Sequence, residues 1–324
     1  MCASLYLMPG IKEGFAAVQT MPGTLFQETP IEIDENLNLD DKKLNIELPD
    51  GIKGKDVKVR TDYVNHTVYV RFAKAIDNYS ENYLVRGSSN HIANLSYYKE
   101  AGEGVLEIKL DKACEASYEY QDNFLCMEFK DLHEVYEKII VVDAGHGGSQ
   151  PGAVKKDICE KQLNLEIVLK LKELLDEVDE KKVKVFYTRL KDENPSLADR
   201  ADMANQLDAD LFISVHNNAS ADGKFSSLNG TMVLYSESQS DEESKKFAEI
   251  CLENVTESAR SKNLGLVKGD DIYIIRTSEV PVALIEVGYM TNTKELNNLC
   301  SADYQKKVAE GIYNAIMQAF EEGF

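Results

Sequence analysis

Hydrophobic residues in the first 130 positions recur at every second position in several short segments. The clearest of these are residues 31–33, 44–48, 57–60, 67–72, 105–110 and 124–129. A period of two is typical of strands with one buried face, and the Asp, Asn and Gly residues between the segments indicate turns. We therefore expect a small antiparallel β-sandwich over residues 31–130, preceded by an irregular, proline-containing arm at residues 1–30.

From about residue 136 the pattern changes to apolar runs that alternate with helical stripes. Strands are expected at 138–143, 183–187, 211–215, 231–235, 271–276 and 282–287. Helices are expected at 160–178, 196–207 (capped by Ser196), 240–258 and, to close the chain, about 304–319. This alternation predicts a single α/β domain at residues 136–324, with a mostly parallel, twisted sheet flanked by helices.

The strand at 138–143 leads into an unusual turn. Residues 139–142 are four consecutive β-branched residues, which is typical of a strand buried on both faces. A Gly-His-Gly-Gly turn follows at 145–148, and glycine there allows a sharp bend and the close approach of a ligand. Because open α/β sheets place their sites at the carboxyl ends of strands, we expect His146 to lie at such an edge.

Two further residues are expected at the same edge. His216 follows the predicted strand 211–215, and Glu160 begins the helix after the first strand. Two imidazoles and one carboxylate, with a fourth position open to water, form a common catalytic zinc set. Each residue also has a simpler interpretation: His146 as a turn residue, Glu160 as an acid favoured at a helix N-terminus, and His216 as a hydrogen-bonded buried histidine.

Glu286 stands within the apolar strand 282–287. A carboxylate is costly to bury there unless it is paired or lies near a metal. Its pKa is then expected to be raised, which suits a group that takes a proton from a water and returns it to a leaving amine. The alternative is an ion pair with Arg276 or Arg189.

Charge and cysteine content narrow the possible functions. A net charge of −20 at pH 7 argues against a nucleic-acid partner, because phosphates would be repelled. The six cysteines show neither C-x-x-C nor zinc-finger spacing. Cys114 and Cys126 flank an expected hairpin, so they are either a disulfide or two small buried hydrophobic residues.

The sequence contains no apolar stretch of the roughly 18 residues that a transmembrane helix needs. The first residues lack a basic region and meet Pro9, so they are not typical of a signal peptide. An export signal is therefore not visible: either it was removed, or the protein is not exported by that route.

Several motifs together resemble the zinc-dependent N-acetylmuramoyl-L-alanine amidases of the amidase-3 type, which are cell-wall hydrolases. The matching segments occur in order at residues 140–153, 159–165, 187–189, 196–200, 213–219 and 284–292. The resemblance implies one Zn²⁺ per chain, held by His146, Glu160 and His216, with Glu286 as the catalytic carboxylate. It also implies an extracytoplasmic enzyme whose substrate is peptidoglycan, cut between the lactyl group of N-acetylmuramic acid and L-alanine.

Other matched residues have open roles. Asn217 and Asn218 are either substrate contacts or ordinary polar loop residues. Arg189 and Arg200 either hold loops in place through carboxylates or bind a stem-peptide carboxylate, and Arg189 is the candidate substrate contact of the two. Residues 31–130 resemble AMIN-type domains in their β-rich pattern and in their position before the amidase-like part, which implies a wall-targeting role or a regulatory partner. The rival functions are a zinc peptidase or deacetylase acting on another amide, and a non-catalytic wall-binding module.

Overall fold

The computed structural model describes residues 43–87, 91–237 and 242–324, and the expected arm at 1–30 and strand at 31–33 lie outside them. The chain divides into two compact units, with the boundary between Val135 and Tyr136. Each unit has its own hydrophobic core, and each is described by itself below.

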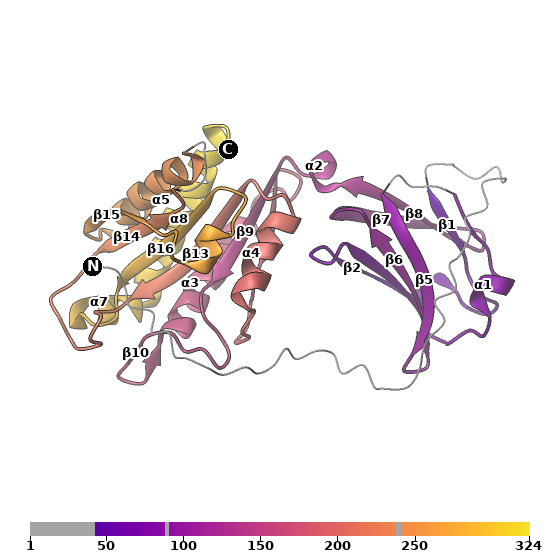
Figure 1. Cartoon of the computed structure of the whole chain (residues 1–324), viewed down its shortest axis with the longest axis horizontal. Helices are drawn as coiled ribbons and strands as arrows, with labels where there is room; N and C mark the ends of the chain where they lie inside the picture. The colour runs from indigo at the N-terminus through magenta and orange to yellow at the C-terminus, as the bar shows by residue number, and fades with distance from the viewer. Residues whose placement is uncertain (1–42, 88–90, 238–241) are drawn as a thin grey trace. The chain divides into compact units, whose positions relative to one another are not determined.

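The N-terminal unit is an antiparallel sandwich (Figure 1). Its strands are β1 (Leu44–Glu47), β2 (Val57–Asp62), β3 (Thr67–Phe72), β4 (Val85–Arg86), β5 (Ile92–Glu100), β6 (Glu103–Leu110), β7 (Cys114–Gln121) and β8 (Phe124–Asp131). One sheet has the order β4-β1-β8-β7 and the other β2-β3-β6-β5. Apolar residues of both sheets share one core, which confirms the predicted sandwich. The short segments η1 (Gly54–Asp56), α1 (Tyr79–Asn82) and α2 (Leu132–Val135) complete the unit.

Three strands of this unit, β4, β5 and β7, are additions to the expected set. β7 is exposed along most of its length after Cys114, although apolar or aromatic residues alternate with polar ones in its sequence. β5 carries buried residues only near its middle, at Leu95 and Ser96. β7 pairs with β8 and β5 pairs with β6 along their whole lengths.

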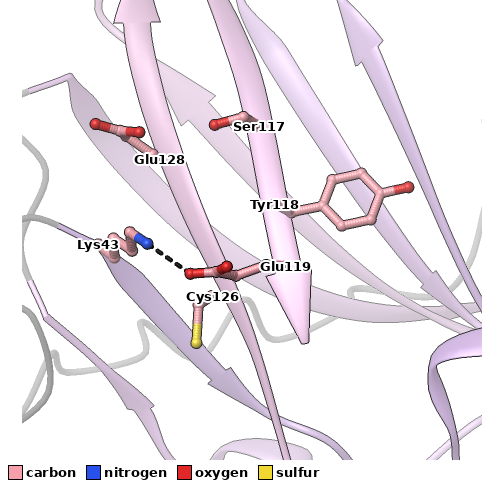
Figure 2. A pocket seen from close by; sticks show the side chains of 6 residues that line it. All are labelled: Lys43, Ser117, Tyr118, Glu119, Cys126 and Glu128. Atoms are coloured by element: carbon pink, nitrogen blue, oxygen red, sulfur yellow. Dashed lines mark hydrogen bonds and ion pairs between the residues drawn. The ribbon is translucent and has the colours of Figure 1, made fainter. Parts of the chain in front are cut away.

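Cys114 and Cys126 are both free thiols, so the disulfide alternative is wrong. They lie on neighbouring strands, but Cys114 pairs with Asp131 and Cys126 with Glu119, at different levels of the ladder. Cys126 lies beside the ion pair between Lys43 and Glu119, in a surface hollow of about 250 Å³ (Figure 2).

The C-terminal unit is built on one six-stranded sheet (Figure 1). Its strands, in spatial order, are β12 (Val183–Tyr187), β9 (Lys138–Ala144), β13 (Leu211–Asn218), β16 (Val282–Tyr289), β14 (Thr231–Tyr235) and β15 (Asn263–Lys268). The first four are mutually parallel, whereas β14 pairs antiparallel with β16 and parallel with β15. A small hairpin of β10 (Val154–Lys155) and β11 (Ile158–Cys159) precedes the first helix.

Helices cover both faces of this sheet, as predicted. They are α3 (Glu160–Leu175), α4 (Leu197–Gln206), α5 (Glu243–Ala259), α6 (Tyr273–Arg276), α7 (Thr293–Leu299) and α8 (Ala302–Glu321). The apolar faces of α3, α5 and α8 share one core with Ile140 and Val142 of β9. α4 contacts β9 and α6 contacts β16. Ile139 and Val141 alternate with the core residues of β9 and are buried toward the opposite face.

The strand expected at 271–276 is wrong, because Tyr273–Arg276 is the short helix α6 and the strand is β15 at Asn263–Lys268. A short apolar run does not distinguish a strand from a buried helical turn by periodicity alone, and Ile274 and Ile275 are buried in the helix. β15 is half-exposed and carries Gly265 at φ +87°, which hides its strand character in the sequence.

Among the described residues, no helix has both the length and the apolar character to cross a bilayer.

Candidate metal centre and active site

The glycine turn after β9 brings two histidines together. Gly145 donates its N–H to the main-chain oxygen of Val215 at 3.0 Å, so the turn lies against the end of β13. A Cβ atom on Gly145 would lie 2.2 Å from Nε2 of His216, so only glycine leaves room for that ring. The rings of His146 and His216 meet edge to face with their centroids 4.8 Å apart.

His146 has a left-handed backbone conformation, with φ +61°. Such a conformation is uncommon for a residue with a side chain and costs on the order of 1 kcal/mol or more. It persists here because Arg200 donates to the main-chain oxygen of His146 at 2.8 Å. The strained turn therefore directs the imidazole toward Glu160.

Glu160 connects the two histidines. One carboxylate oxygen, Oε2, lies 3.2 Å from Nε2 of His146, and the other, Oε1, lies 3.0 Å from Nδ1 of His216. Its position follows from the sequence, because Glu160 is the first residue of α3 and α3 is anchored in the main core through residues such as Ile167. One ligand atom from each of the three residues lies within 4.8 Å of the others.

The surroundings of Glu160 keep it ionised. Burial alone would raise the pKa of this carboxyl group, but the hydrogen bonds to His146 and His216 outweigh burial and hold the pKa well below its usual range. The backbone N–H groups of Ala153 and Asn217 also donate to the two carboxylate oxygens, at 2.9 and 3.1 Å. An ionised carboxylate between two imidazoles is a donor set that suits a divalent cation.

Glu286 lies at the same edge of the sheet. It pairs with His216 in the β13–β16 ladder, and paired residues of adjacent strands point to the same side of a sheet. Its Oε2 atom is buried and, among the described residues, has no hydrogen-bond partner. Burial, and next the charge of Glu160, raises the pKa of Glu286 well above its usual value. An unpartnered buried carboxyl oxygen beside this donor set fits a site completed by a metal and its water.

Two buried arginines hold the backbone around the site. Arg189 donates to the main-chain oxygens of Ala144, Gly145, Lys161 and Lys191, at 2.7 to 3.2 Å. These bonds favour the structural role for Arg189 over a contact with the substrate. They tie the end of β9 to α3, so Arg189 stabilises the turn that presents His146.

Arg200 forms a buried ion pair with Asp143. Asp143 also accepts from Ser214 at 2.6 Å and from Thr188 at 2.5 Å. Burial alone would raise the pKa of Asp143, but the charge of Arg200 and these hydrogen bonds hold it below its usual value. Asp143 therefore supports His146 through Arg200 and the turn backbone.

The two asparagines after His216 differ in position. Asn217 is buried and donates from Nδ2 to Oδ1 of Asn164 at 2.8 Å, so its side chain belongs to the interior. Asn218 is half-buried, and its side chain contacts Met232 and the N–H of Ala219. Asn164 is a residue that the sequence reasoning missed. It lies four residues after Glu160, is fully buried and donates to the main-chain oxygen of Gly145, and its signal was a polar residue on the apolar face of α3.

Comparison with known proteins shows the family to which this chain belongs. A family profile described as N-acetylmuramoyl-L-alanine amidase matches residues 140–318, which is more than half of the chain and includes all four residues of the site. The chain belongs to this amidase family. The profile match begins after β9 has started, so the N-terminal sandwich lies outside it.

Individual amidases are similar over the same share of the chain. The germination-specific N-acetylmuramoyl-L-alanine amidase of Bacillus subtilis is 32% identical over 198 residues, covering 57% of this chain and 81% of that protein. The crystal structure of an N-acetylmuramoyl-L-alanine amidase from Clostridium difficile 630 has a TM-score of 0.54 at 30% identity, covering 58% of this chain and 98% of that one. The catalytic domain of CwlV from Bacillus (Paenibacillus) polymyxa var. colistinus has a TM-score of 0.52 at 33% identity, with 57% and 98% covered. These likenesses confirm the predicted α/β fold.

Proposed function

We propose that this chain is a zinc-dependent amidase that hydrolyses the bond between the lactyl carbonyl of N-acetylmuramic acid and L-alanine in peptidoglycan. The observation that carries the proposal is the meeting of His146, Glu160 and His216 at one sheet edge, with Glu286 beside them, in a chain of the amidase family. The four residues come from four separate stretches of sequence, so their convergence is a product of the fold.

The metal would be held by the two imidazoles and by Glu160. Bound Zn²⁺ would supply Lewis acidity there, which lowers the pKa of a water and polarises the carbonyl to be attacked. The backbone N–H groups of Ala153 and Asn217 restrain the carboxylate of Glu160. Arg200 and Arg189 restrain the turn that carries His146.

Glu286 is the proposed proton carrier. Its carboxylate takes a proton from the attacking water and then delivers it to the departing amine of L-alanine. The raised pKa of Glu286 suits this exchange, because the carboxyl group holds the proton between the two steps. Asn218 at the end of β13 remains a proposed contact for the substrate amide.

The substrate sets the place of action. Peptidoglycan is extracytoplasmic, so we propose that the chain acts in the cell wall or periplasm. The N-terminal sandwich is proposed as an AMIN-like unit that binds the wall or a regulatory partner. A chain with net charge −20 gains little from electrostatic attraction to anionic wall polymers, so specific contacts would have to target it.

Product analysis on purified peptidoglycan tests the proposed function. The full chain should release stem peptides with free L-alanine amino termini and leave the glycan strands uncut. Treatment with a chelator should stop the release, and added Zn²⁺ should restore it. New amino termini at other residues would indicate a peptidase, release of acetate would indicate a deacetylase, and binding without any release would indicate a wall-binding module. Each of these results would contradict the proposal.

A further inference from the structure

The N-terminal sandwich contains a second cluster of metal-ligating side chains. In the described part of the chain, two sets of three such side chains bring one ligand atom each within 4.8 Å of the others. One set is the site at His146, Glu160 and His216. The other consists of His91, Asp111 and Cys114, and neither the family match nor the proposed amidase activity assigns it a role.

We propose that His91, Asp111 and Cys114 form a binding site for a divalent, borderline-soft metal ion such as Zn²⁺. Nitrogen, oxygen and sulfur donors together are a ligand set that zinc accepts readily. An aspartate and a thiolate contribute two negative charges, which match the charge of the ion, and the imidazole binds in its neutral form.

The backbone fixes two of the ligands opposite each other. Asp111 donates its N–H to the main-chain oxygen of His91 at 2.9 Å, which extends the β5–β6 pairing by one step beyond Ile92 and Leu110. As a result, Nδ1 of His91 lies 3.1 Å from Oδ1 of Asp111. Two ligands at about 2.1 Å from a tetrahedral zinc ion are roughly 3.4 Å apart, so this separation needs little change.

The third ligand comes from the next strand. Cys114 begins β7 only three residues after Asp111, at the crossover from one sheet to the other. Its side chain is almost fully buried, whereas that of Asp111 is 53% exposed and that of His91 is 20% exposed. An ion could therefore enter from the solvent side, keep a water as its fourth ligand and contact the thiol from within.

Metal at this position would tie the two sheets together. β5 and β6 belong to one sheet and β7 to the other, so the three ligands span the crossover. Binding would displace the thiol proton of Cys114 to solvent, and affinity should therefore fall as the pH is lowered. Metal that binds only the folded unit should raise its melting temperature.

Measuring the number of Zn²⁺ equivalents bound by the full chain tests the site independently of the amidase proposal. His216→Ala removes one ligand of the other site, and a second change, Cys114→Ser, is then added. After loading with Zn²⁺ under reducing conditions and gel filtration, the double variant should contain one equivalent less than His216→Ala alone. Cys126→Ser is the matched control, because Cys126 is also a buried free thiol on the same hairpin, and it should lose nothing.

The absorption spectrum of the Co²⁺-loaded protein shows directly whether a thiolate is a ligand. Co²⁺-loaded His216→Ala should show a near-ultraviolet thiolate-to-cobalt absorption band that Cys114→Ser abolishes and Cys126→Ser retains. Asp111→Asn, at an exposed position, should weaken Co²⁺ binding at least tenfold while circular dichroism stays unchanged. Equal metal content in the single and double variants, or a band that survives Cys114→Ser, would overturn the proposal.

Discussion

His216 and Glu286 occupy paired positions on the adjacent parallel strands β13 and β16. The pairing fixes the carboxyl group of Glu286 on the same side of the sheet as the imidazole of His216. A proposed metal ligand and the proposed proton carrier are thus joined by the backbone ladder of the sheet rather than by flexible loops.

Glu286→Gln should keep the shape of the side chain and remove its ability to carry a proton. We expect kcat on purified peptidoglycan to fall by about 10²- to 10⁴-fold, while the zinc content of the protein is unchanged. Glu166→Gln on α3 is a matched control that should retain full activity, since Glu166 hydrogen-bonds Gln162 and Gln305, neither of which belongs to the site. Normal turnover in Glu286→Gln would remove Glu286 from the mechanism.

Gly145→Ala should displace a proposed metal ligand. The added Cβ atom would lie 2.2 Å from Nε2 of His216, so the ring must move. We expect metal affinity and activity to fall at least about tenfold, as measured by zinc titration and peptidoglycan turnover. Gly223→Ala serves as a control for an added methyl group that meets no neighbour, since no atom lies within 4 Å of it; its φ of +65° strains the backbone, whereas Gly145 has no positive φ. Equal effects in the two variants would mean that the clash with the ring of His216 is not responsible.

Arg200→Lys should separate the charge of this residue from its hydrogen bonds. A lysine can still pair with Asp143, but it cannot also donate to the main-chain oxygens of Ala144 and His146. We expect the folded protein to bind zinc about 10- to 100-fold more weakly, with a corresponding loss of activity at limiting zinc. Excess zinc should restore part of the activity. Unchanged zinc affinity would show that the turn holds His146 without this arginine.

Asp143→Asn should change how stability depends on pH. The pKa of the Asp143 carboxyl group is lowered in the folded state. As the pH falls, the unfolded chain therefore protonates Asp143 at a higher pH than the folded chain does. The stabilisation is complete above the unfolded value of about 3.9 and is lost as the pH falls through the folded value. The variant should be about 3–5 kcal/mol less stable at pH 7, and this difference should shrink below pH 4.

Urea denaturation at several pH values measures this difference. Asp202→Asn, at an exposed position on α4, should match the original protein throughout the range. A stability difference between Asp143→Asn and the original protein that stays constant down to pH 3 would contradict the assignment of the acid sensitivity to Asp143.

Hydrophobic periodicity predicted most of the α/β unit because its elements are long or fully buried. The strand around Val141 is apolar on both faces, and α4 begins after the predicted cap Ser196. The strand was predicted at residues 271–276, where α6 lies, and not at β15. The half-exposed edge strand β15 contains a glycine and has no strong hydrophobic pattern, whereas the buried helical turn α6 has an apolar run that resembles a strand. Local sequence does not carry the information that decides between them.

The four residues of the site could be proposed from sequence because each follows a recognisable signal at one sheet edge. The residues that hold these four side chains in place were harder to predict. Asn164 and the ion pair of Asp143 with Arg200 depend on contacts between residues far apart in the chain. For Arg189 and Asn217 the sequence left two interpretations open, substrate contact or structural support, and their burial favours structural support.

β14 runs in the opposite direction to β13 and β16, and this direction determines where the segment before β14 lies. The chain leaves β13 and begins β14 at the same edge of the sheet, so residues 219–230 cross the end of β16 and rest on Thr291 through Ser220 and Ser226. Phe225 and Leu228 of this crossing are about half exposed. Because surface loops tolerate insertions and deletions better than the strands they connect, the length of this segment can change while the six strands keep their register.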